Sequence, residues 1–168
     1  EKARELEDSI AKEPANIVIV MVGEGDRVTL KSSSGRRVAI MSDEWRAEYG
    51  RRLDRIIKAV KQKNAGVYWV GLPNLARGDA NQQALGMNEV IRERAYQNGL
   101  RFIDAIAGFQ DEIGAYSAYG PDMTGKVRVL REPDGVNFTE AGNRKLAHFV
   151  EKELRRDLNQ AKTERTVP

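Results

Sequence analysis

The side chains that could do chemistry gather after one apolar run of the sequence. Residues 17–22 read IVIVMV, and the next five, GEGDR, hold the carboxylates of Glu24 and Asp26 between two glycines and an arginine. A β-branched run of this length predicts a strand of a parallel sheet that is buried on both faces. Gly23 and Gly25 permit a tight turn at its carboxyl end, which is the edge where open α/β sheets bind ligands.

Carboxylates at strand ends allow one kind of site, a metal centre. Glu24, Asp26 and Asp134 would offer the oxygen ligands that Mg²⁺ and Ca²⁺ prefer. Acidic residues also form turns and hydrogen bonds in such loops, and this simpler role is the more common one. We therefore predict no metal and no other cofactor, and keep the carboxylate site as an alternative.

Groups for proton transfer and nucleophilic attack are scarce. The chain has no cysteine and a single histidine, His148, which falls inside the last predicted helix and is expected on its surface. Ser9 lies within a helical pattern, and the gap from Ser9 to Ile17 is shorter than a parallel crossover requires. We therefore expect neither residue to act in catalysis.

Composition and charge limit the class of protein. The 168 residues, 40% apolar and 32% charged, suit one globular domain over residues 1–158 with a polar tail at 159–168. The 28 basic residues are interleaved with 25 acidic ones, which argues against a surface that binds nucleic acid. The longest apolar run is too short to span a membrane, and no targeting peptide is recognisable.

Hydrophobic periodicity predicts helices and strands in alternation. Ser42 and Thr139 have the side chains expected of helix N-caps. The pattern predicts helices over 3–12, 43–60, 81–98 and from 140 onward, and strands over 17–22, 67–72 and 101–104. Such an order implies βαβ crossovers and a parallel sheet.

Two loops follow strands of this sheet and could form the mouth of a pocket. They are residues 74–80, which are polar, and residues 116–122. The second loop belongs to an excursion over residues 105–133 that is too long for a simple connection and is predicted to contain a small hairpin. We predict Asn74 and Tyr119 as pocket residues. A module that binds a ligand or partner without catalysis is therefore an alternative function.

Together these motifs resemble the SGNH, or GDSL-type, hydrolases, and most of all a bacterial exported branch of that superfamily. The resemblance extends from Pro14 to about Leu158 and is carried by GEGDR, SDEWRAEYGRR, YWVGLP, SAYGPD and DGVNFTEAGNRKLAHFV. It implies an α/β fold, a flavodoxin-like three-layer sandwich with a mainly parallel sheet. It also implies ester hydrolysis by a serine near the amino terminus, and a periplasmic or exported location.

The resemblance further implies the residues of the site. Gly23 lies at the family's oxyanion glycine, in the same loop as Asp26, and Asp134 lies at the aspartate of its Asp-x-x-His pair. Gly25 replaces an asparagine that donates to the oxyanion, and Asn137 replaces the histidine base. An amide takes up no proton near neutral pH, and loss of the base costs on the order of a million-fold in rate. We therefore expect an inactive member of an esterase lineage, whose relatives act on small esters.

The family's nucleophile block is missing from the given sequence. In the family topology the strand that carries it lies directly beside residues 17–22, so the pattern leaves open whether the sheet lacks its first strand. Soluble proteins pair, cover or charge an apolar edge strand. We therefore expect residues 17–22 to pair with a missing N-terminal segment or, by self-association, with a second copy of the chain.

Overall fold

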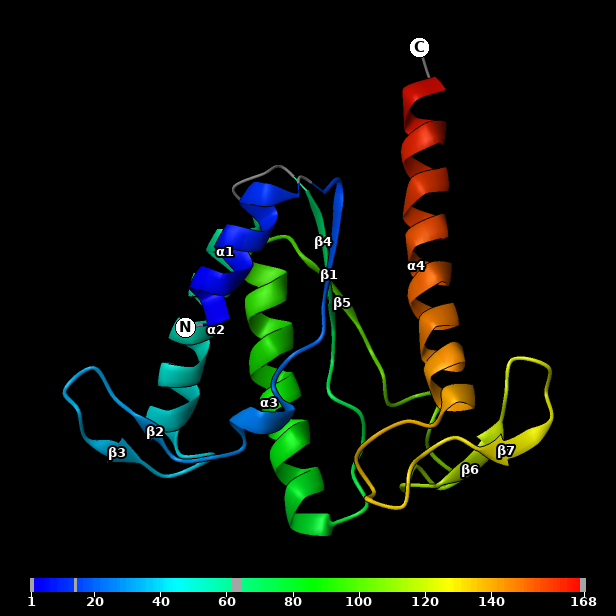
Figure 1. Cartoon of the computed structure of the whole chain (residues 1–168), viewed down its shortest axis with the longest axis horizontal. Coiled ribbons are helices and arrows are strands. Elements are labelled where there is room, and N and C mark those ends of the chain that lie inside the picture. The colour runs from blue at the N-terminus through cyan, green and yellow to red at the C-terminus, as the bar shows by residue number, and fades with distance from the viewer. Residues whose placement is uncertain (1, 14, 62–64, 167–168) are drawn as a thin grey trace. The chain divides into compact units, whose positions relative to one another are not determined.

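A computed structural model describes residues 2–13, 15–61 and 65–166 of the chain (Figure 1). The chain divides into two compact units. The first unit contains residues 1–73 and 77–104, and the second contains residues 74–76 and 105–168. Each unit is described by itself below.

A parallel three-stranded sheet is the centre of the first unit. Its strands are β1 (Ile17–Val20), β4 (Gly66–Val70) and β5 (Arg101–Ile103), in the order β1-β4-β5. Ile17 is in register with Gly66, and Tyr68 with Arg101. The predicted α/β class with a parallel sheet is confirmed.

Three helices of the first unit accompany this sheet (Figure 1). α2 (Asp43–Lys61) and α3 (Gly78–Gln97) pack against each other and against the strands, and α1 (Lys2–Lys12) packs on α2. The Trp45 and Trp69 side chains are fully buried. The predicted cap of α2 is confirmed, because the backbone N–H of Trp45 donates to Ser42 Oγ at 3.2 Å.

The burial of β1 differs from the prediction. The strand ends at Val20, and Ile17, Ile19 and Met21 remain 39%, 49% and 40% exposed, whereas Val20 is buried. The expectation of burial on both faces is therefore wrong. Alternate side chains of a strand point to opposite faces, and only the set that includes Val20 is covered.

The edge position of β1 matches the expectation from the sequence. In the described sheet β1 pairs with β4 alone, so its other side has no strand partner among the described residues. The missing segment or second copy that would cover this edge remains a prediction. Pro14, where the family resemblance begins, lies outside the described residues.

Between β1 and α2 the chain makes a short 3-10 turn and a small hairpin. The turn η1 covers Glu24–Asp26, and the hairpin pairs β2 (Leu30–Lys31) with β3 (Arg37–Val38) in antiparallel register. The serine-rich stretch at residues 32–34 lies between the two strands of this hairpin. Its base is tied to α2, because the Trp45 indole N–H donates to the Val28 carbonyl at 2.8 Å.

The second unit contains another hairpin and the last helix. β6 (Tyr119–Pro121) pairs antiparallel with β7 (Val127–Val129), as predicted for the long excursion. α4 (Glu140–Thr166) begins after Thr139, whose Oγ1 accepts the N–H of Gly142 at 3.1 Å. The predicted cap is therefore confirmed.

Residues 159–166, which we predicted as a polar tail, form the last turns of α4. Side chains four residues apart face each other on a helix, and their contacts favour the helical conformation. Here the Gln160 amide donates to Glu164 Oε1 at 3.0 Å. Among the described helices, none has the length and apolar character needed to cross a membrane.

Candidate functional site

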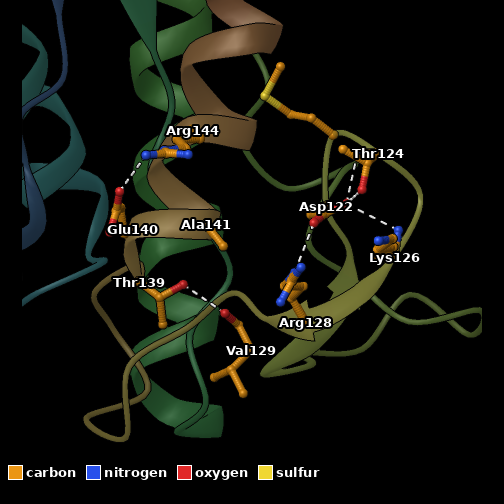
Figure 2. A pocket seen from close by; sticks show the side chains of 10 residues that line it. Asp122, Thr124, Lys126, Arg128, Val129, Thr139, Glu140, Ala141 and Arg144 are labelled. Atoms are coloured by element: carbon orange, nitrogen blue, oxygen red, sulfur yellow. Dashed lines mark hydrogen bonds and ion pairs between the residues drawn. The ribbon is translucent and has the colours of Figure 1, made fainter.

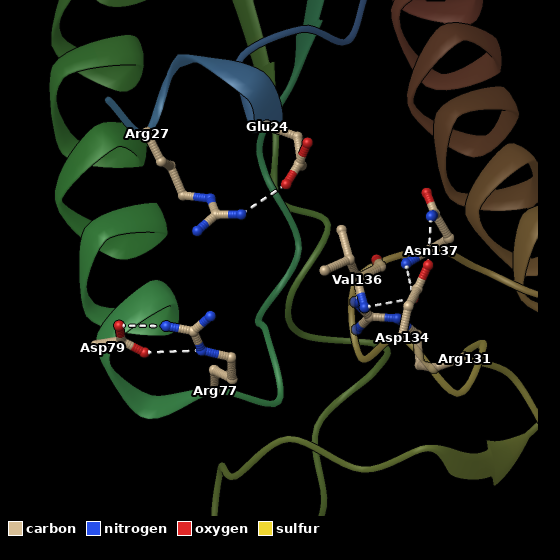
Figure 3. Close-up of polar contacts among 8 residues, drawn as sticks. All are labelled: Glu24, Arg27, Arg77, Asp79, Arg131, Asp134, Val136 and Asn137. Atoms are coloured by element: carbon tan, nitrogen blue, oxygen red, sulfur yellow. Dashed lines mark hydrogen bonds and ion pairs between the residues drawn. The ribbon is translucent and has the colours of Figure 1, made fainter. Parts of the chain in front are cut away.

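The turn after β1 holds the residues that the sequence analysis assigned to an oxyanion loop. Gly23 adopts φ of 126°, and its carbonyl accepts the N–H of Asp26 at 2.9 Å, which closes the 3-10 turn. Glu24 forms an ion pair with Arg27 at 2.6 Å across the same turn (Figure 3). Gly23, Gly25 and Asp26 thus lie in one compact loop of the first unit.

Gly23 packs closely against Tyr49 of α2. A Cβ placed on Gly23 would lie 2.9 Å from the Tyr49 hydroxyl. That hydroxyl is buried and has no hydrogen-bond partner among the described residues. Burial, and to a smaller extent the charge of Asp26, raises the pKa of Tyr49 well above its usual range. Tyr49 therefore stays neutral and fixes the position of the turn by contact.

This contact gives a prediction for the turn. Gly23→Ala should lower the free energy of unfolding of the first unit by about 1–3 kcal/mol, because its φ is unfavourable for a side chain and the methyl group meets Tyr49. The matched control is Gly25→Ala, since a Cβ there meets nothing within 4 Å. Urea unfolding followed by fluorescence of Trp45 and Trp69 measures both. Equal effects of the two substitutions on the free energy of unfolding would contradict a close contact between Gly23 and Tyr49.

The second unit contains the other half of the predicted site, a turn from Asp134 to Asn137 (Figure 3). Asp134 Oδ1 accepts the backbone N–H groups of Val136 and Asn137, both at 2.8 Å. Its Oδ2 accepts the side-chain amide of Asn137 at 2.6 Å. The structure therefore brings the two residues together as a hydrogen-bonded pair.

These bonds decide the electrostatics of the turn. The backbone N–H groups of Asn137 and Val136, followed by the Asn137 amide, lower the pKa of Asp134. The carboxylate is therefore ionised at neutral pH and acts as an acceptor. Its partner Asn137 is an amide, which donates a hydrogen bond to Asp134 but cannot take up a proton near neutral pH.

The other candidates for acid, base and nucleophile lie elsewhere in the fold. Ser9 is exposed within α1, as the sequence pattern predicted. His148 is exposed within α4, which confirms the expected surface position. No group of three or more Asp, Glu or His side chains suited to hold a metal ion occurs among the described residues.

A buried arginine, Arg131, supports the Asp134 turn, and no feature of the sequence predicted this role. Arg131 is 1% exposed; it donates to the Val136 carbonyl at 2.8 Å and to Asn74 Oδ1 at 3.1 Å. Its guanidinium also lies over the Phe138 and Tyr116 rings, at 4.5 and 5.0 Å from their centres. Desolvation lowers the pKa of Arg131, although the residue remains a cation.

The predicted pocket residues have different environments. Asn74 is buried, and its amide contacts the Phe109 carbonyl at 3.5 Å in addition to Arg131. Tyr119 is 63% exposed in β6. Neither side chain lines the cavity of about 670 Å³ that the second unit contains, so their assignment to a pocket remains a prediction.

Comparison with known families covers most of the chain. The family described as "Protein of unknown function (DUF459)" matches residues 2–153. The chain belongs to the DUF459 family. No curated protein matches the sequence of this DUF459 chain.

Solved structures show which fold this DUF459 chain has. A GDSL-like lipase from Bacteroides thetaiotaomicron is similar with a TM-score of 0.64 and 12% identity, over 92% of this chain and 69% of that one. An aryl esterase from M. smegmatis gives a TM-score of 0.57 and 19% identity, over 91% and 66%. A variant of an acetyl xylan esterase from Geobacillus stearothermophilus gives 0.61 and 20%, over 90% and 65%.

These similarities establish the fold of the DUF459 chain as that of GDSL-type esterases and acylhydrolases. The resemblance predicted from the sequence motifs is confirmed at this level. The chain spans about two thirds of the length of these structures, from 65% to 69%.

Proposed function

We propose that this DUF459 chain is a member of the SGNH esterase lineage that does not hydrolyse esters. One observation carries the proposal, the hydrogen bond of 2.6 Å between the Asn137 amide and Asp134. In an Asp-x-x-His pair the imidazole would make this contact and accept the nucleophile's proton on its other nitrogen. Here the pairing is kept, but the place of the imidazole is taken by an amide, which cannot accept a proton near neutral pH.

The expected loss in catalytic rate is large enough to favour inactivity over reduced activity. Removal of a triad base alone costs on the order of a million-fold in kcat. Asp134 does not substitute for it, because its lowered pKa makes the carboxylate a weaker base than an ordinary one. The exposed position of His148 in α4 supports no role in its place.

The oxyanion loop has lost a donor as well. Gly25 offers only a backbone N–H where the esterases of this lineage carry an asparagine amide. Loss of one such donor costs roughly 100 to 1,000-fold in rate. The loop has room for a Cβ at position 25, since such an atom meets nothing within 4 Å. Packing therefore does not explain the glycine.

Hydrolysis of a short-chain nitrophenyl ester tests the proposal. We expect the chain and its Ser9→Ala variant to release product at the same rate as a protein-free blank. Repeating the assay with Mg²⁺ and Ca²⁺ tests the carboxylate metal site that remains the alternative. Turnover that requires either ion would favour that alternative, and turnover without added metal would contradict inactivity.

A further inference from the structure

A cavity in the second unit lies between the β6–β7 hairpin and the first turns of α4 (Figure 2). Its volume of about 670 Å³ falls in the range of small-molecule sites. All of its lining residues belong to the second unit: Asp122, Met123, Thr124, Lys126, Arg128, Val129, Thr139, Glu140, Ala141 and Arg144. None of them is part of the Asp134 turn.

The polar acceptors in this cavity are used within the protein. Asp122 Oδ1 accepts the N–H of Thr124 at 2.8 Å, the Thr124 hydroxyl at 2.7 Å and the N–H of Lys126 at 3.1 Å. Its Oδ2 accepts Nε of Arg128 at 3.1 Å. These bonds, the Thr124 hydroxyl first, hold the pKa of Asp122 far below its usual range. Asp122 therefore organises the hairpin and leaves little capacity for a cationic ligand.

The donors of the cavity are less fully used. The described residues include no ion-pair partner for the Lys126 ammonium, whereas its backbone N–H holds Asp122. Arg128 contacts Asp122 through Nε, and Arg144 contacts Glu140 through Nη2 at 2.6 Å. Both guanidinium groups have further N–H donors beyond these contacts.

A buried ammonium adds positive charge beside the cavity. Lys145 is 8% exposed, and its Nζ donates to the Pro121 carbonyl at 2.7 Å, next to Asp122 in the sequence. It lies one helical turn after the lining residue Ala141. Its other close contacts are the Phe109 and Phe149 rings, at 5.3 and 6.0 Å from their centres. No carboxylate among the described residues forms an ion pair with this ammonium.

We propose that this cavity binds a small anion with several oxygen acceptors, either a carboxylate or a phosphate. Among the lining residues, the cations Lys126, Arg128 and Arg144 outnumber the carboxylates Asp122 and Glu140, and an anion would meet N–H donors that the protein leaves available. Apolar atoms of Met123, Val129 and Ala141 complete the wall. The proposal does not depend on whether the chain hydrolyses esters.

Titration of the 168-residue chain with phosphate and, separately, with acetate, followed by amide NMR, tests this site. We expect one of the two anions to shift signals of residues 122–129 and 139–144, with binding that weakens as NaCl rises. Lys126→Gln should weaken that binding about fivefold, the effect of one exposed ion pair. The hairpin should stay folded, because the Lys126 backbone N–H is kept.

Lys152→Gln is the matched control, since it removes the same charge from an exposed position of α4. Equal weakening by both substitutions would show attraction by net charge alone and overturn the proposal. The proposal is also overturned if neither anion shifts these signals when the anion is added in 20-fold excess over protein, up to an anion concentration of about 10 mM. Binding weaker than this would be too weak to count as specific. The anion that binds identifies the ligand as a carboxylate or a phosphate.

Discussion

Replacing Arg131 with methionine is expected to lower the free energy of unfolding of the second unit by about 3 kcal/mol. The substitution removes the donors of two acceptors. Arg131 Nη1 donates to Asn74 Oδ1, and Nη2 donates to the Val136 carbonyl. The substitution also removes the cation that lies over the Phe138 and Tyr116 rings. Methionine fills similar space but makes no hydrogen bond to either acceptor.

Hydrogen exchange resolves this effect, because Trp45 and Trp69 both lie in the first unit and fluorescence would report on that unit. Amides around residues 130–139 should exchange faster in the variant, while tryptophan fluorescence stays unchanged. Arg128→Met serves as control, since the Arg128 side chain is exposed and its ion pair within the described part of the chain is with Asp122 at 3.1 Å. Equal acceleration by both substitutions would show that the buried contacts of Arg131 contribute little.

The second prediction with a large effect concerns the protonation of a histidine placed at position 137. Asn137→His should introduce an imidazole whose pKa is raised above its ordinary value of about 6.5, because the ionised Asp134 beside it favours the charged form. The stability that this pair adds is therefore present at pH below 6.5 and is lost as pH rises through the raised pKa. We expect no ester hydrolysis from this variant, since a base without an activated serine forms no acyl-enzyme.

NMR titration of the imidazole protons measures that pKa, with His148→Gln in the same chain to assign the two histidines. Asn159→His, at an exposed position of α4, is the reference for an imidazole without a carboxylate partner. An equal pKa at positions 137 and 159 would show that Asp134 does not engage the residue at 137. A large gain in hydrolysis would show that a serine of this chain serves as nucleophile.

Local patterns in the sequence were sufficient to predict most elements of the fold. Apolar runs gave the three parallel strands, and Ser42 and Thr139 marked the helix starts that the structure confirms. The pairing of Asp134 with Asn137 was implied by the resemblance to the Asp-x-x-His pair of the SGNH hydrolases, and the two side chains are hydrogen bonded at 2.6 Å.

Features that depend on packing between distant segments were not predictable. Nothing in the letters LREPDG indicates that Arg131 is buried between two rings, since arginine is usually exposed. The exposed face of β1 was missed for a related reason. A continuous apolar run is the same whether one face of the strand is covered or both.

The most direct test of whether the esterase fold has been kept without its chemistry is a hydrolysis assay with nitrophenyl acetate. The rate of nitrophenol release is measured against protein concentration between pH 7 and 9. Replacement of the base by Asn137 predicts fewer than one product molecule per chain over several hours, and no change on Asp134→Asn. Repeated turnover by the chain that Asp134→Asn abolishes would contradict inactivity and would place a working catalyst at the Asp134 turn.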